Sequence, residues 1–166
     1  MKNKAMTRRI LNPFAMLCFG LAIGVVARLL DIFTTNLGEI FSQMAAWILM
    51  GTLISIYSRT AKHAMGNVLA FCLGMLVTYY FAAALSHGAY SMKFIIGWTV
   101  FALCSPVMAY FAWLTKGRGI FAKIVGVGIV AVSILSSILL FDRLRIYDFL
   151  IDGTLIYLLF FKKVNR

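Results

Sequence analysis

Six long apolar runs, separated by short polar breaks, fill almost the whole chain. They lie at about residues 14–33, 39–57, 64–86, 92–114, 120–140 and 143–161. Each is close to the roughly 20 residues that a helix needs to cross a bilayer. Backbone polar groups in hydrocarbon must be satisfied internally, so such segments form helices or a closed barrel. The runs lack strand-like alternation. The sequence therefore predicts an all-α polytopic membrane protein with six transmembrane helices.

The composition agrees with a membrane protein and excludes a typical soluble domain. Hydrophobic residues make up 63% of the 166 residues, and charged residues only 13%. Soluble domains are about half apolar and about a quarter charged. The six runs leave no room for a separate soluble domain, so residues 1–166 are predicted to form a single helical bundle. The first apolar run is too long for a signal peptide and lacks a small-residue cleavage site, which indicates a retained first helix.

The distribution of charge predicts the orientation of the bundle, because cytoplasmic loops are enriched in Lys and Arg. With the start of the chain in the cytoplasm, 12 of the 16 basic residues are cytoplasmic: Lys2, Lys4, Arg8, Arg9, Arg59, Lys62, Lys116, Arg118, Lys123, Lys162, Lys163 and Arg166. All five acidic residues then fall in the outer half: Asp31, Glu39, Asp142, Asp148 and Asp152. Both termini are predicted to be cytoplasmic, and the expected location is a bacterial inner membrane. The net charge of +11 then reflects topology and not binding to nucleic acid.

The last run carries charges at a depth that lipid does not tolerate. If Lys162 marks the cytoplasmic boundary, Asp152 lies about 15 Å deeper at roughly 1.5 Å per residue, near the middle of a core about 30 Å thick. Spacings of three and four place Arg145, Asp148 and Asp152 on one helix face. The same face continues with Leu155, Ile156 and Leu159. An aspartate at mid-depth costs about 2.5–3.5 kcal/mol, so Asp152 must face protein or water.

Two interpretations of these charges remain open. In one, they form a structural ion network with Arg28 and Asp31 of the first run. In that network Arg28 is a candidate partner of Asp152, or it pairs locally with Asp31 three residues away. In the other, the first and last helices enclose an outward-facing polar cavity that binds a polar solute or a cation. Aromatic residues and His87 at outer depths could complete such a cavity. The predicted substrate-binding set is Arg28, Asp31, Tyr79, Tyr80, Trp98, Arg145, Asp148 and Asp152. Proton-linked transport is also left open.

A stripe of small residues runs along the first predicted helix. Gly20 and Gly24 are four residues apart, and Ala27 follows one turn later. Such a stripe allows another helix to approach closely. That helix can belong to the same chain, or to a membrane-protein partner that docks on the stripe.

Sequence motifs for catalysis or metal binding are absent. The chain has no His-Glu-x-x-His, Cys-x-x-Cys, Gly-x-Ser-x-Gly or phosphate-loop pattern. Its three cysteines lie inside apolar runs without metal-ligand spacing. No catalytic residue, metal or cofactor is therefore predicted. The leading functional hypothesis is a small transport protein or solute-binding subunit. The alternatives are a non-catalytic accessory protein with structural charges, and a membrane enzyme acting on a lipid or envelope precursor.

Several short segments resemble an uncharacterised bacterial family of small multi-helix integral membrane proteins. The resemblance lies in residues 20–31, 47–51, 79–80, 105–106 and 116–119. It implies a membrane protein and assigns no chemistry. In architecture alone, the predicted chain is similar to the substrate-binding subunits of energy-coupling factor transporters. That similarity implies six helices with cytoplasmic ends, capture of a vitamin or metal ion from outside, and docking of a transmembrane partner through small residues of the first helix.

Overall fold

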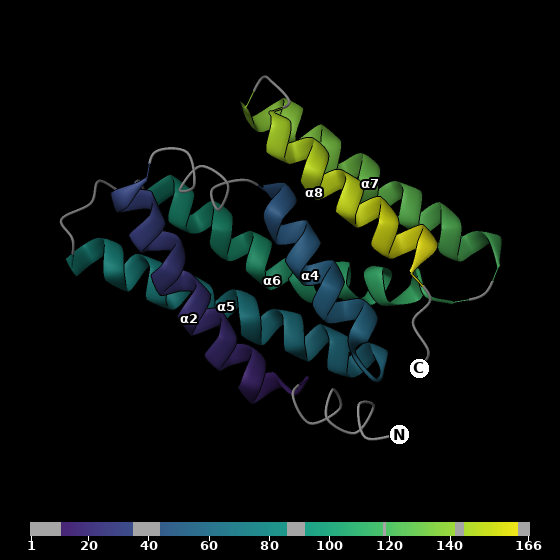
Figure 1. Ribbon diagram of the computed structural model, residues 1–166. Coiled ribbons are helices and arrows are strands. Elements are labelled where there is room, and N and C mark those ends of the chain that lie inside the picture. Colours follow the sequence, from purple (N-terminus) through teal and green to yellow (C-terminus); the bar gives the residue numbers. More distant parts are fainter. Residues whose placement is uncertain (1–10, 35–43, 86–91, 118, 142–144, 163–166) are drawn as a thin grey trace.

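The computed structural model describes residues 11–34, 44–85, 92–117, 119–141 and 145–162 (Figure 1). These residues form six α-helices and no strand. The helices are α2 (Pro13–Phe33), α4 (Met44–Tyr57), α5 (Ala61–Leu85), α6 (Met92–Leu114), α7 (Ile120–Phe141) and α8 (Ile146–Ile156). A π-helical segment, η1 (Tyr157–Phe161), continues α8. The predicted all-α fold is confirmed.

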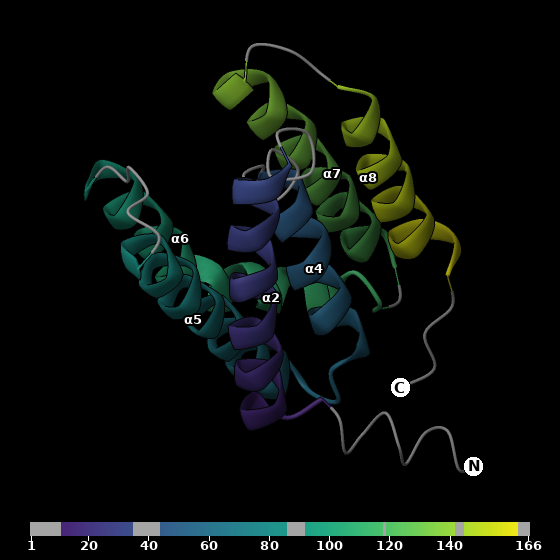
Figure 2. The ribbon, with the colours of Figure 1, turned by 60° about the vertical axis from the view of Figure 1, so that its left-hand side comes forward.

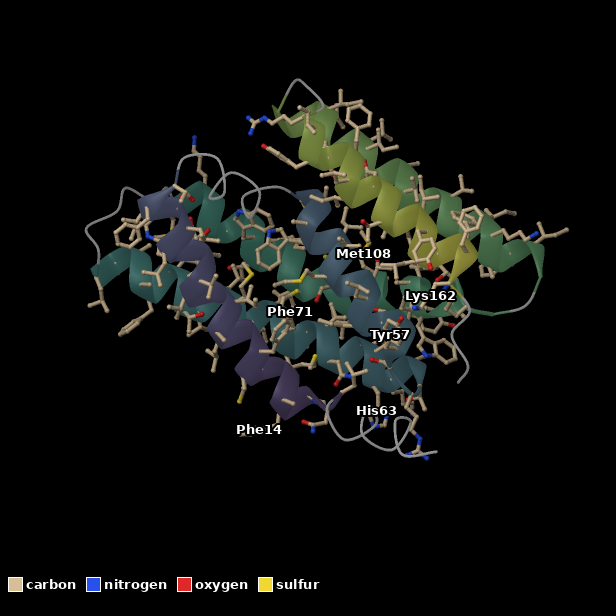
Figure 3. All side chains as sticks on the ribbon, in the orientation of Figure 1. Phe14, Tyr57, His63, Phe71, Met108 and Lys162 are labelled. Carbon is tan, nitrogen blue, oxygen red and sulfur yellow. The ribbon has the colours of Figure 1, made fainter. Side chains whose placement is uncertain are left out.

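Four of the helices are long and apolar enough to cross a membrane, namely α2, α5, α6 and α7. Large apolar side chains cover the outside of the described bundle. Phe14, for example, is 75% exposed, whereas Phe71 lies in the interior and is 1% exposed (Figure 3). This surface suits lipid and not water, so the chain is a helical membrane protein.

Two predicted spans are only partly represented by these helices. The 14 residues of α4 extend about 21 Å at roughly 1.5 Å per residue, less than the hydrocarbon thickness of about 30 Å. The first residues of the predicted run 39–57 lie outside the described part of the chain. The same holds for residues 143 and 144 of the last predicted run.

Glycines allow α2 to lie directly against α5. A Cβ atom at Gly20 would overlap the carbonyl oxygen of Phe71, and one at Gly24 would overlap Thr78 Oγ1. The Thr78 hydroxyl donates a hydrogen bond to the Leu21 carbonyl at 2.8 Å. Small residues and interhelical hydrogen bonds are the usual means by which membrane helices associate. The predicted stripe is therefore used within the chain, and α5 covers the two glycines that were considered for docking a partner.

The helix α4 occupies the centre of the bundle. It packs against α5, α6, α7 and α8, and the α7–α8 pair lies on the side of α4 away from α2 (Figures 1 and 2). Two apolar cores result. One joins α2, α4, α5 and α6 around Phe71. The other joins α4 to the last helices through Ile56, Leu155, Leu158 and Leu159.

Long-range hydrogen bonds tie one end of the bundle together. The Asn67 amide donates to the Leu11 carbonyl at 3.3 Å and to Ser58 Oγ at 3.0 Å. The Trp113 indole donates to the Ser58 carbonyl at 3.2 Å. These bonds join the segment preceding α2, the end of α4, the start of α5 and the end of α6.

The ammonium group of Lys116 caps the C-terminus of the last helix. Its Nζ donates to the carbonyl oxygens of Leu159 at 3.1 Å and Lys162 at 2.8 Å, and also to that of Leu158. The last carbonyls of a helix have no intrahelical donors, and a cation is favourable there. Lys116 directly follows α6. Its contact therefore holds the C-terminus of the last helix on the side of the bundle where α2 begins.

Replacing Gly24 by Leu should destabilise the bundle. The side chain would separate α2 from α5, and overpacking of this kind costs about 1–3 kcal/mol or more. Thermal unfolding of the purified protein in detergent measures the effect. Ala22→Leu is the matched control, because Ala22 is on the exposed face of the same helix. Equal unfolding temperatures for the two variants would contradict the α2–α5 contact.

Replacing Lys116 by Met should loosen the end of α8 while leaving α2 and α5 unchanged. Hydrogen bonds to a charged group make a net contribution of about 1.5–3 kcal/mol when they are buried. Hydrogen–deuterium exchange should therefore become faster in residues 155–162. Lys123→Met is the control, since Lys123 is exposed. Unchanged exchange in that segment would show that the cap is dispensable.

Candidate functional site

The structure divides the predicted binding residues into three separate groups. Four of them meet between the last turns of α2 and α5, beyond the glycine contact. Arg28 Nη1 lies 2.6 Å from Asp31 Oδ2, and the Tyr79 hydroxyl donates to the same oxygen at 3.2 Å. The Tyr80 ring packs edge-on against that of Tyr79, with centroids 5.3 Å apart. This group is a partly exposed ion pair with aromatic cover.

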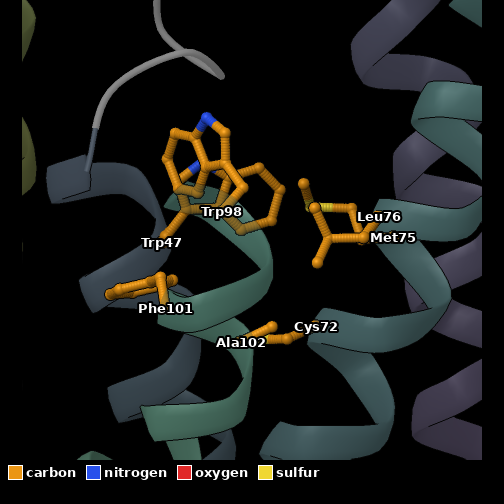
Figure 4. Close-up of a pocket in the computed structure, with 7 residues that line it drawn as sticks. All are labelled: Trp47, Cys72, Met75, Leu76, Trp98, Phe101 and Ala102. Carbon is orange, nitrogen blue, oxygen red and sulfur yellow. The ribbon is translucent and has the colours of Figure 1, made fainter. Parts of the chain in front are cut away.

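Trp98 belongs to a second group, which is apolar (Figure 4). Its ring lies 6.2 Å from that of Trp47 and 5.8 Å from that of Phe101, both edge-on. Together they border a gap of about 10 Å³ between α4, α5 and α6, large enough for roughly one water molecule. Its other lining residues are Cys72, Met75, Leu76 and Ala102. No polar side chain of the predicted set lines this gap.

The third group lies along the contact of α7 and α8. Ser133 Oγ on α7 donates to Asp152 Oδ1 on α8 at 2.6 Å. Asp148 Oδ2 accepts the backbone N–H of Arg145 at 2.8 Å, which caps the start of α8. The Arg145 side chain bonds the hydroxyl of Tyr147. Asp148 is 0% exposed and Asp152 is 7% exposed. We call Ser133, Ser137, Asp148 and Asp152 the α7–α8 seam.

Within the described residues, the first and last predicted helices do not enclose the predicted cavity. The two helices do not pack against each other, and α4 lies between them (Figure 2). Of the two partners predicted for Arg28, the structure shows Asp31 on its own helix and not Asp152. The physical reason is the small-residue stripe, which directs α2 to α5. His87, also considered for the cavity, lies outside the described residues.

The face predicted on the last helix is largely correct. Four of its residues that follow the three-and-four spacing are buried, namely Asp148, Asp152, Leu155 and Leu159. The buried face is therefore polar toward the start of α8 and apolar toward its end. Ile156, predicted on the same face, is 39% exposed, because it lies one residue beyond the buried stripe.

Sequence reasoning missed the serines opposite the two acids. Ser133 is 0% and Ser137 1% exposed, and both lie on the α7 face that meets α8. Their spacing of four residues in an otherwise apolar run was a visible signal. A hydroxyl can also bond the backbone of its own helix, as Ser137 does with the Ser133 carbonyl at 3.3 Å. The spacing alone therefore does not identify a site.

Electrostatically, the seam differs from the α2–α5 group. Asp31 has a cation in contact, whereas neither Asp148 nor Asp152 forms an ion pair within the described residues. Asp148 Oδ1 is enclosed and has no hydrogen-bond partner there. Buried carboxylates are costly unless they are paired, hydrogen-bonded or neutralised by a proton or cation. The seam is therefore the strongest candidate site in the described residues.

Comparison with known proteins places the chain in a family. A family of unknown function, DUF6518, matches residues 3–142. The chain belongs to this family. The match includes α2 to α7, and therefore Ser133 and Ser137, but ends before α8. The predicted resemblance to an uncharacterised family is confirmed. No curated protein and no solved structure matches the chain.

Replacing Ser133 by Ala should destabilise the protein by about 1–3 kcal/mol, because the Asp152 carboxylate would lose its hydrogen-bond donor. Ser136→Ala is the matched control, since the Ser136 hydroxyl bonds the backbone carbonyl of Ser133 at 2.8 Å and not the acid. Thermal unfolding of the two variants makes the comparison. A loss as large in Ser136→Ala would argue against the Ser133–Asp152 bond.

Proposed function

We propose that the chain is a small bacterial inner-membrane protein that binds and transports a polar solute or cation at the α7–α8 seam. In this proposal six helices cross the membrane, with both termini in the cytoplasm. Exposed basic residues support that orientation. Arg59, Lys62, Lys123 and Lys162 lie at the end of the bundle where α2 begins, and cytoplasmic segments favour such residues. Asp31 and Asp148 lie toward the opposite end.

The observation that carries the proposal is the burial of two carboxylates without an ion pair. A structural network would place a cation beside each acid, as Arg28 lies beside Asp31. Asp152 has a neutral hydroxyl instead. Ionisable residues within a membrane are costly and commonly mark the path of a solute or ion. The missing positive charge is supplied when the protein takes up its ligand.

A second candidate function is a non-catalytic accessory role with purely structural charges. It is favoured by the cap that Asp148 provides to α8 and by the Ser133–Asp152 bond, since each contributes to folding without any ligand. The two candidates differ in what removal of the Asp152 charge should do. If Asp152 belongs to a binding site, removing its charge abolishes ligand binding. If Asp152 is purely structural, removing its charge prevents folding.

Asp152→Asn should abolish binding while leaving the bundle folded. The amide keeps the size of the side chain and its bond to Ser133 but removes its charge. Purified protein is screened with polar solutes and inorganic cations for an increase in unfolding temperature, and hits are tested for uptake into proteoliposomes. Asp31→Asn, which changes the exposed acid of the α2–α5 group, should keep the response. A wild-type protein that responds to no solute, combined with an Asp152→Asn variant that fails to fold, would favour the accessory role.

A further inference from the structure

The seam is closed by direct contact between helices, which limits the size of what it can bind. Ser133, Ser137 and Asp148 are at most 1% exposed. Leu155, one turn C-terminal to Asp152 on α8, is 0% exposed and closes that side of the seam. An organic solute would require these helices to separate. A proton needs no extra space there, and a single dehydrated ion would require only a small displacement of the side chains.

The chemistry of the seam favours a hard cation. Its side chains present carboxylate and hydroxyl oxygens, and in the described residues no three His, Cys, Asp or Glu side chains group as they do around a transition metal. The helices α7 and α8 are antiparallel, and Ser133 is level with Asp152. One turn nearer to the loop between the helices, Ser137 is therefore level with Asp148. The Oδ1 atom of Asp148, buried and without a partner among the described residues, adds an unused acceptor to this set.

The balance of charge favours a single positive charge. Asp148 lies in the first turn of α8 and accepts the Arg145 N–H, so the helix N-terminus stabilises its negative charge. Asp152 is one turn further on, where the effect of the helix dipole has largely faded. One neutral hydroxyl is its hydrogen-bond donor. The charge that remains to be compensated is that of one carboxylate.

Titratable side chains on the surrounding elements do not supply this charge. The elements that pack against α8 are α4, α7 and η1. Their described titratable residues are Tyr57 on α4, Lys123 on α7 and Tyr157 on η1, all exposed, and α8 itself adds Arg145, Tyr147 and Asp148. Lys123 lies in the first turn of α7, at the end remote from Ser137. Arg145 precedes α8, and its guanidinium bonds Tyr147.

We propose that the α7–α8 seam binds one monovalent positive charge at Asp152, carried by a proton or by a dehydrated alkali cation of about sodium size that competes with it. This inference rests on the proposed function and names its ion. Binding involves no covalent step, because the cation occupies carboxylate and hydroxyl oxygens that a proton otherwise neutralises. Asp148, Ser133 and Ser137 complete the oxygen set.

Thermal unfolding of the full chain in lipid nanodiscs tests the ion directly. Sodium, lithium and potassium chloride are compared with choline chloride at equal ionic strength, about 100 mM, at about pH 6 and about pH 8.5. Sodium or lithium should raise the unfolding temperature by roughly 3–6 °C at the higher pH. The increase should be smaller at the lower pH, where protons compete. If the proton is the only ion, cations have no effect, and stability should fall as the pH rises.

Substitutions test whether the response to sodium and the response to pH arise at the seam. Asp152→Asn should lose both the sodium response and the fall in stability with pH, and Asp31→Asn should keep them. If Asp152→Asn does not fold, Ser137→Ala provides the second test, because it leaves both carboxylates and should weaken the sodium response several-fold. A wild-type protein insensitive to cations and pH, or an Asp152→Asn variant that keeps the response, would overturn the proposal.

The same measurements separate this inference from the proposed function. An organic solute that stabilises the protein in an Asp152-dependent way, with no response to cations or pH, would refute the monovalent ion and retain the binding site. A folded Asp152→Asn variant that behaves like the wild type toward every solute and ion would refute both.

Discussion

The close contact of α2 with α5 determines the arrangement of the other helices. Gly20 and Gly24 remove the side chains that would hold the two backbones apart, and van der Waals contact then takes the place of the hydrophobic effect, which is weak between helices in lipid. Once α2 is committed to α5, α4 has a face free for α7 and α8. The second apolar core and the polar seam both depend on that division.

The same division of the helices determines the partners of the charged residues. Arg28 and Asp31 are carried away from α8, and they pair locally across one turn. The acids of α8 meet serines of α7 instead of a cation. Two clusters of similar composition thus have different electrostatics. One is neutral by itself and partly exposed, whereas the other is enclosed and forms no ion pair within the described residues.

The positions of the helices could be predicted closely because apolar runs are a property of the chain alone. The buried stripe on α8 was also accessible, because the spacing of Asp148, Asp152 and Leu155 places them on one face in any helix. Neighbouring helices were harder to predict, because a residue that faces lipid and one that faces another helix are equally apolar. Arg28 shows the limit clearly. Its depth permitted a bond to Asp152, but an acid three residues away on its own helix was closer.

The two buried aspartates also bear on how the protein reaches its membrane. A segment with two acids inserts poorly by itself, since each aspartate near the centre costs about 2.5–3.5 kcal/mol on insertion scales. Both helices that enclose these acids, α4 and α7, precede α8 in the chain. They leave the ribosome first and can be in place when α8 emerges. The faces of α4 and α7 that meet α8 are then a receiving surface during biogenesis, and weakening them should lower the yield of inserted protein.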